Sequence, residues 1–76
     1  MAEWTNRNIE LDQLEEFEKW AQALIRTGDD TVENLWCVYY LKDDPKIIYT
    51  APLLTYVDNP ITKDECDGFF LYQMVN

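Results

Sequence analysis

The amino-acid sequence predicts an α+β fold, in which one amphipathic helix packs on a small antiparallel sheet of three strands. Apolar residues recur at helical spacing between Leu14 and Ile25. Two runs rich in β-branched and aromatic residues follow, separated by a polar turn, and a short apolar run comes last. The predicted order is therefore helix, strand, strand, strand. All 76 residues are expected to form a single domain (1–76), which is near the lower size limit for independent folding.

The first ten residues are polar and weakly patterned, and Trp4 and Ile9 supply their large apolar side chains. Two such residues are too few to define a helical stripe or a long strand. Residues 1–10 are therefore compatible with either a short edge strand or a loose arm packed on the domain.

The helix is expected from about Leu11 to Thr27. Its apolar stripe consists of residues that repeat every three or four positions: Leu14, Phe17, Trp20, Ala21, Leu24 and Ile25. Asp12 and Glu15 have the spacing of a capping box at the N-terminus. Arg26 suits the last turn, where the helix dipole favours a cation, and Gly28 suits the left-handed position that ends a helix.

The first two strands are expected at Thr31 to Lys42 and at Lys46 to Val57, as an antiparallel hairpin. The residues between them form a polar turn, in which Pro45 can occupy the second position. Pro52 lacks a backbone donor, so it predicts that the second strand lies at a sheet edge or at a bulge.

The last third of the chain is expected to form a loop and one more strand. Residues 61–68 are predicted to be a loop or a single helical turn, because Thr62 and Glu65 have the spacing of a short capping box. Gly68 and the short apolar run after it favour a strand over a helix. The third strand is therefore predicted from Phe69 to Val75.

One helix can cover only one face of this sheet. A strand with one face in water alternates apolar and polar residues, yet Leu35 to Leu41 is an unbroken run of seven apolar or aromatic residues. We therefore expect another chain, either a second copy of this protein or a different partner, to cover the second face. Aromatic side chains dominate binding energy at interfaces. The candidate anchors are Trp36, Tyr39, Tyr40 and Tyr49.

The charge balance is strongly acidic. Fifteen Asp and Glu residues face six Lys and Arg residues, which gives a net charge of −9. Direct binding to nucleic acid or to an anionic membrane is disfavoured, because both require clusters of Lys and Arg. A surface field of this sign favours a basic partner protein instead.

The sequence carries no catalytic or metal-binding signature. It has no histidine, the commonest general base and metal ligand, and its two glycines cannot build a phosphate-binding loop. The distant Cys37 and Cys66 are too few for a zinc site, and the carboxylates between Asp58 and Asp67 lack the spacing of a calcium loop. We therefore predict that the protein is not an enzyme and uses no cofactor or metal ion.

The sequence also indicates a compartment. The first residues lack the basic and apolar regions of a secretory signal peptide, and no apolar run has transmembrane length. The two cysteines do not form a disulfide framework and are expected to stay reduced. These observations predict a protein of the cytoplasm, in a bacterium or in an infected host cell.

Carboxylates on the outer side of the predicted helix are the candidate contact groups. Helical side chains three or four positions apart lie about 5–6 Å from each other, close to the spacing of phosphates along a nucleic-acid strand. The turn between the first two strands and the loop at 58–67 can extend this row. The candidate acids are Asp12, Glu15, Glu16, Glu18, Asp43 and Asp44. The alternative interpretation is an ordinary solvated helix face with pairs such as Glu15 and Lys19.

In size and charge alone, the chain resembles the small acidic inhibitors that bacteriophages make against host proteins, including anti-restriction proteins, anti-CRISPR proteins and inhibitors of DNA-repair enzymes. This resemblance implies a nucleic-acid mimic that inhibits a nucleic-acid-handling protein. The first alternative is an immunity protein or antitoxin that neutralises a basic toxin. The second is a structural or accessory subunit that dimerises.

Overall fold

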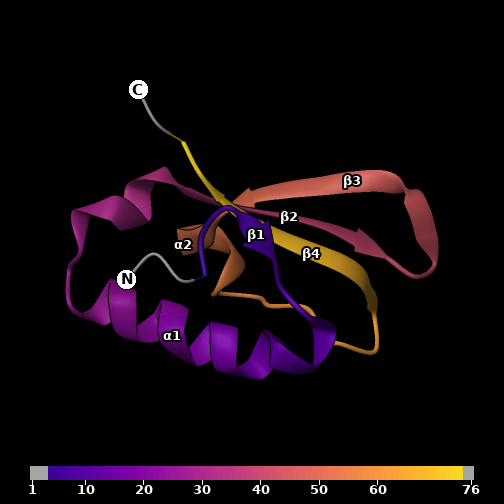
Figure 1. Cartoon of the computed structure of the whole chain (residues 1–76), viewed down its shortest axis with the longest axis horizontal. Helices are drawn as coiled ribbons and strands as arrows, with labels where there is room; N and C mark the ends of the chain where they lie inside the picture. Colours follow the sequence, from indigo (N-terminus) through magenta and orange to yellow (C-terminus); the bar gives the residue numbers. More distant parts are fainter. Residues whose placement is uncertain (1–3, 75–76) are drawn as a thin grey trace.

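The structure, a computed structural model, describes residues 4–74. The strands form one antiparallel sheet in the order β1-β4-β2-β3, and α1 packs against it (Figure 1). The predicted α+β class is confirmed, but the sheet has four strands where three were expected. The elements in chain order are β1 (Arg7–Asn8), the 3₁₀ helix η1 (Leu11–Gln13), α1 (Leu14–Arg26), the 3₁₀ helix η2 (Asp30–Asn34), β2 (Leu35–Leu41), β3 (Asp44–Pro52), α2 (Leu53–Tyr56) and β4 (Cys66–Gln73).

The additional strand is β1, which lies in the segment that was compatible with either an edge strand or a loose arm. Arg7 pairs with Leu71 of β4, and Asn8 pairs with Phe70. The backbone N–H of Gln73 also donates to the side-chain oxygen of Asn6 (3.0 Å). The described part of the first ten residues therefore forms an edge strand, and residues 1–3 lie outside the described residues.

The helix ends as predicted but begins differently. Gly28 has a φ of +74°, the left-handed conformation expected at the end of a helix, and its N–H donates to the carbonyl of Ile25 (3.0 Å). The predicted capping box at Asp12 is wrong, because neither Glu10 nor Gln13, the capping positions of η1 and α1, makes a side-chain cap. Asp12 lies inside η1, whereas an N-cap residue needs an extended backbone.

β2 begins at Leu35, four residues later than predicted. Asp29 accepts hydrogen bonds from the backbone N–H and the hydroxyl of Thr31 (2.9 and 2.7 Å), and this cap starts η2. The residues from Thr31 to Asn34 are therefore helical, although their β-branched side chains fit a strand equally well.

The second predicted strand is too long at its C-terminal end. β3 stops at Pro52, and Leu53 to Tyr56 form α2. Leu53 and Tyr56 are three positions apart and both buried, which a helical turn achieves by placing them on one face. The prediction from Pro52 is confirmed, since β3 is an edge strand.

The hairpin turn is also tighter than predicted. Leu41 pairs with Asp44, so the connection consists of Lys42 and Asp43, and Pro45 lies within β3 and not in the turn. The register shifts between Tyr39, which pairs with Tyr49, and Leu41. β3 therefore carries extra residues opposite Tyr40, a bulge that accommodates a proline at the free edge.

The loop before the last strand shows the predicted pairing of Thr62 with Glu65. The Thr62 N–H donates to the Glu65 carboxylate (3.3 Å), and the Glu65 N–H donates to the Thr62 carbonyl (3.1 Å). β4 then runs from Cys66 to Gln73, so the predicted third strand is present and begins three residues early. Val75, its predicted end, lies outside the described residues.

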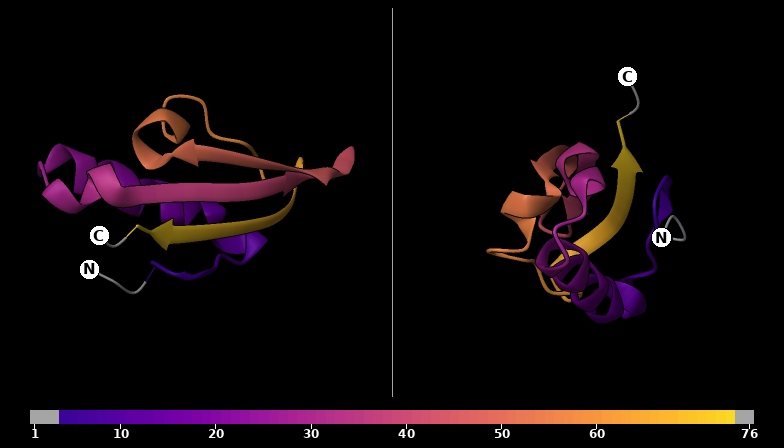
Figure 2. Two further views of the ribbon diagram at one scale, coloured as in Figure 1. Left: turned by 90° about the horizontal axis from the view of Figure 1, so that it is seen from above. Right: turned by 90° about the vertical axis from the view of Figure 1, so that its left-hand side faces the viewer.

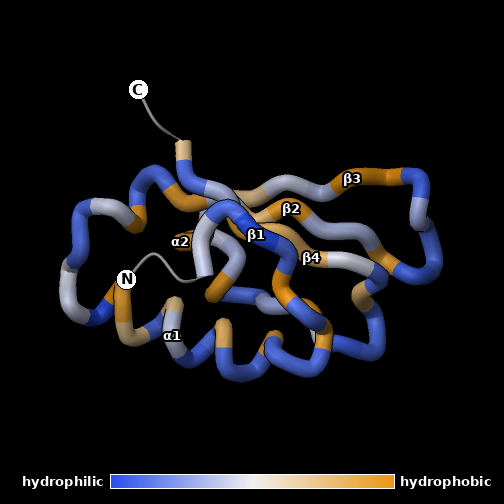
Figure 3. Tube along the Cα trace, in the orientation of Figure 1, coloured by the Kyte–Doolittle hydropathy of each residue, from blue (hydrophilic) through white to orange (hydrophobic). Residues whose placement is uncertain are grey.

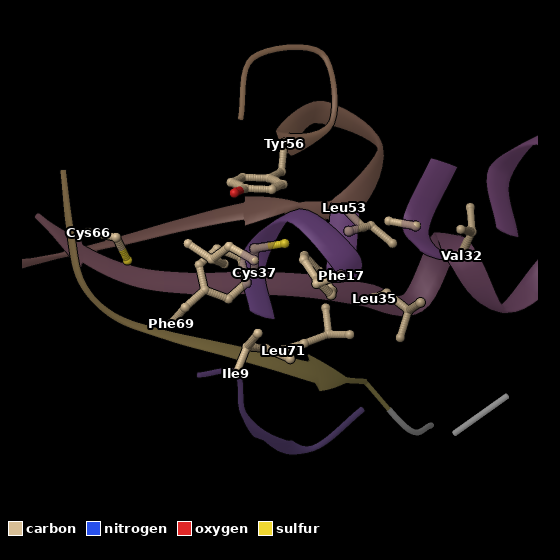
Figure 4. Packing of buried hydrophobic residues seen from close by; sticks show 12 residues of the cluster. Ile9, Phe17, Val32, Leu35, Cys37, Leu53, Tyr56, Cys66, Phe69 and Leu71 are labelled. Atoms are coloured by element: carbon tan, nitrogen blue, oxygen red, sulfur yellow. The ribbon is translucent and has the colours of Figure 1, made fainter. Parts of the chain in front are cut away.

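The core lies between the sheet and the helices, and Phe17 of α1 stands within it (Figure 4). Leu14, Phe17 and Ala21 of the predicted stripe are buried, whereas Trp20, Leu24 and Ile25 are half-buried. β2 contributes Leu35 and Cys37, β4 contributes Phe69 and Leu71, and α2 contributes Leu53 and Tyr56.

Candidate functional site

Three segments that are far apart in the sequence meet at one end of the molecule: the start of α1, the loop before β4, and the turn between β2 and β3 (Figure 1). The backbone N–H of Lys42 in the turn donates to the carbonyl of Glu65 in the loop (2.9 Å). The loop and the start of α1 share a cavity. These segments are largely hydrophilic along the Cα trace (Figure 3).

All three segments carry carboxylates, and we call this end of the molecule the acidic end. Its members are Asp12, Glu15, Glu16, Glu18, Asp43, Asp44, Asp64 and Glu65. All are exposed except Glu18, which is half-buried. Four lysines lie in or beside the same segments, so the surface keeps an excess of negative charge: Lys19, Lys42, Lys46 and Lys63. The fold thus places the segments that carry all six candidate acids at one end, together with Asp64 and Glu65 of the loop that was expected to extend their row.

The cavity between α1 and the loop has a volume of about 380 Å³. Leu11 and Leu14 line it from the helix side, and Pro60 and Ile61 line it from the loop. The carboxylate-bearing residues of its wall are Asp12, Glu15, Glu18 and Asp64, and Lys63 and Thr62 complete it. The cavity therefore combines an apolar surface with a mainly anionic one.

Glu18 differs electrostatically from the other acids of this wall. Partial burial raises the pKa of its carboxyl group, and the neighbouring charge of Glu15 raises it further. A carboxylate with less water around it and a like charge beside it gains more from a nearby cation than an exposed one does.

Tyr56 lies next to the same wall, and its side chain is 2% exposed. Burial raises the pKa of its hydroxyl, and the charge of Glu18 raises it further. The backbone of Ile61 is near enough to oppose this shift slightly, but the hydroxyl has no hydrogen-bond partner among residues 4–74. A buried hydroxyl without a partner is unusual.

The four candidate aromatic anchors do not share a surface. Tyr39 faces the core, where its ring stacks on Tyr49 (centroids 5.5 Å apart, 12° between planes) and on Phe69 (5.8 Å, 8°). Trp36 and Tyr40 alternate with Tyr39 along β2 and point to the opposite face of the sheet. Two of the anchors are thus held in internal stacking, and two remain on the outside.

The opposite side of the sheet carries half-buried and exposed apolar residues, which we call the outer face. No helix lies in front of it in the left view of Figure 2, where α1 lies behind the strands. Tyr40 is 38% exposed and Ile48 is 58% exposed. The outer face consists of Trp36, Val38, Tyr40, Ile48, Thr50, Phe70 and Tyr72.

Some residues of the outer face and of the cavity region were not identified as candidates from the sequence. Tyr72 could have been identified as an outer-face residue, because it lies two positions after Phe70 in the same strand. Asp64 belongs to the loop that was expected to extend the row of helix acids, but the sequence did not show that it shares a cavity with α1. Tyr56 was predicted to lie in a strand, so the sequence did not indicate that it lies near Glu18.

The cysteines offer no reactive thiol at this surface. Cys37 and Cys66 are both free and fully buried. Burial raises the pKa of the Cys37 thiol to about 12, so the nucleophilic thiolate form is scarce near neutral pH.

Within residues 4–74, no three side chains of the metal-binding types come together in an arrangement that could hold a metal ion. None of the helices in this described range is long and apolar enough to cross a membrane. Comparisons of this chain with protein-family models, with curated proteins and with solved structures gave no match.

Proposed function

We propose that this protein is a binding protein, not an enzyme, which inhibits a basic nucleic-acid-handling protein by occupying its nucleic-acid groove. The observation that carries this proposal is the acidic end. Three separate segments that carry carboxylates meet at one end of the molecule, and the net charge of the chain is −9. A groove lined by Lys and Arg attracts such a surface as it attracts a phosphate backbone.

The geometry of α1 suits this role. Glu15 and Glu18 are three positions apart in α1, so their Cβ atoms are about 5–6 Å apart, and Asp12 lies in η1, just before the helix. Asp43 and Asp44 continue the surface beyond the loop. Long-range attraction would speed association, and aromatic contacts from the outer face would slow dissociation. Such an inhibitor acts in the cytoplasm of a bacterium or of an infected host cell, and a phage origin of the anti-restriction or anti-CRISPR type fits it.

The test begins with the immobilised protein, which captures partners from a bacterial lysate for identification by mass spectrometry. The purified partner is then titrated with this protein in the presence of DNA or RNA. The proposal predicts that the partner binds nucleic acid and that nucleic acid and this protein displace each other. A partner that binds both at once, or that has no affinity for nucleic acid, contradicts it.

An immunity protein or antitoxin would use the same acidic end against a basic toxin enzyme. A co-expression assay separates this alternative from the first proposal, because the captured partner would then be an enzyme whose toxicity to cells is abolished by this protein.

A second candidate function rests on the outer face. Trp36, Tyr40 and Ile48 belong to the outer face, which no helix within residues 4–74 covers, and this favours a structural or accessory subunit that dimerises. This function predicts a dimer in sedimentation at micromolar concentration, and it predicts that Tyr40→Lys restores the monomer. A wild-type monomer under these conditions contradicts it.

A further inference from the structure

We infer that the cavity between α1 and the loop before β4 receives one long cationic side chain, an arginine or a lysine, from the protein partner. This inference rests on the proposed function and makes it specific, since it assigns one pocket and one chemical group within the acidic end.

The wall of the cavity matches both parts of such a side chain. Leu11, Leu14 and Ile61 offer apolar surface for an alkyl stem, and Glu15, Glu18 and Asp64 offer carboxylates for a terminal cation. Lysine and arginine bury their stems along apolar surface and keep their charged groups beside polar ones. About 380 Å³ is ample for one side chain and too small for a folded segment of a partner.

The hydroxyl of Tyr56 lies behind this wall, beside Glu18 and the backbone of Ile61, and Tyr56 does not itself line the cavity. The groups that receive the cation are therefore the carboxylates of Glu15, Glu18 and Asp64. A guanidinium has five N–H donors and an ammonium has three, so either can donate to more than one carboxylate.

The electrostatics of the wall favour a cation and exclude an anion. Glu18 is partly withdrawn from water, and the negative charge of Glu15 repels its carboxylate. A positive charge beside both groups reduces this repulsion. Hydrogen bonds that involve charged groups are stronger than neutral ones. The lone Lys63 at the wall does not balance the four carboxylates.

The experiment uses small probes and the ¹H–¹⁵N spectrum of the full chain. Nα-acetyl-arginine methylamide, the lysine analogue and the neutral citrulline analogue are titrated in turn. The inference predicts saturable shifts at the amides of Glu18, Ile61 and Thr62 with arginine, with lysine or with both, and none with citrulline. The stronger of the two cationic probes identifies the preferred side chain. Equal shifts with citrulline, or shifts spread over all exposed acids, overturn the inference.

Matched variants separate the cavity from bulk charge. Glu18→Gln and Glu16→Gln each remove one negative charge from α1, but only Glu18 lines the cavity. The inference predicts that Glu18→Gln weakens probe binding by about tenfold and that Glu16→Gln changes it less than about twofold. Equal losses in the two Gln variants overturn the inference.

The two proposals fail in different ways. If the captured partner competes with nucleic acid but loses the same affinity with Glu16→Gln as with Glu18→Gln, the mimicry stands and the cavity has no special role. If the cationic probes occupy the cavity but the partner does not compete with nucleic acid, the cavity assignment stands and the inhibitor proposal fails.

Discussion

Phe17 of α1 and Phe69 of β4 meet in the core with their ring centroids 5.3 Å apart and their planes inclined by 59°. The ring of Phe17 also packs against Trp20 at 5.9 Å and against Tyr56 at 6.3 Å. One fully buried side chain thus links the helix to the sheet and to α2.

Truncation of Phe17 to Ala should therefore cost about 3–5 kcal/mol, a large part of the stability of a domain of this size. Trp20 was expected to be buried to the same degree, but it is half-buried, so Trp20→Ala should cost less. Urea denaturation of the two variants beside the parent measures both values. Equal midpoints for Phe17→Ala and the parent would show that the helix does not pack on β4 in this way.

Gly28 should tolerate substitution poorly although it has room for a side chain. A Cβ atom there would meet nothing within 4 Å, so the cost arises from its φ of +74° alone. Gly28→Ala should destabilise the fold by about 1 kcal/mol, and Gly28→Asn should cost less because Asn adopts this conformation more readily. Thermal unfolding of the pair checks the ranking, and an Ala variant as stable as the parent would contradict it.

Stability should fall at alkaline pH. Burial raises the pKa of the Cys37 thiol from 9.0 to about 12 and also raises the pKa of the Tyr56 hydroxyl. Both groups lose their protons more easily in the unfolded chain, so their contribution is fully present below about pH 9 and is lost as the pH rises towards 12. Urea midpoints at pH 7, 9 and 10.5 measure the loss.

The matched variant for this effect is Cys37→Ala, which removes one of the two buried thiols whose pKa is raised by burial. It should be less stable than the parent at pH 7, because it leaves a small cavity, but its stability should fall less steeply between pH 9 and 10.5. A slope identical to that of the parent would exclude Cys37 as a source.

The proposed inhibition should depend on the position of the acids and not only on their number. Glu15→Lys with Glu16→Lys changes the net charge from −9 to −5. Exposed charges contribute little to folding, within about 0.5 kcal/mol each, so this variant should fold. It should bind the captured partner with a much slower association rate, and parent binding should weaken as salt shortens the Debye length below about 10 Å.

The control is Asp30→Lys with Glu33→Lys, which gives the same net charge through two exposed residues of η2, away from the acidic end. Its association rate should stay closer to that of the parent. Binding that is insensitive to salt and to the Glu15 and Glu16 reversal would refute the mimicry and would point to the outer face.

The sequence predicted best where structure depends on near neighbours. The stripe from Leu14 to Ile25 defines a helix by its period, and Gly28 ends it through backbone geometry that the residue itself allows. α2 was missed because Leu53 and Tyr56 fit a buried strand as well as a helical turn. β1 remained one of two alternatives because two residues acquire strand geometry only through their pairing with β4.

The same distinction holds for the candidate site. The acids of α1 follow from helical spacing, so they could be identified before the fold was known. The cavity could not, because Asp64 and Tyr56 approach Glu18 only after the loop and α2 have packed on the helix. Tyr39 and Tyr49 were grouped with Trp36 and Tyr40 as anchors, since a sequence does not show which face of a buried sheet each ring will take.

The pairing of β1 with β4 also constrains when this protein can fold during synthesis. Arg7 finds its partner in Leu71, and Asn6 accepts its hydrogen bond from Gln73, a contact that spans 67 positions of the chain. The strand that the ribosome makes first therefore has nothing to pair with until β4 has left the exit tunnel. The β2–β3 hairpin can form much earlier, because its contacts are local. At that stage the hydrophobic core on which α1 packs still lacks Phe69 and Leu71 of β4. Folding should consequently be completed after translation has passed β4, and the nascent chain should stay exposed to chaperones and proteases until then.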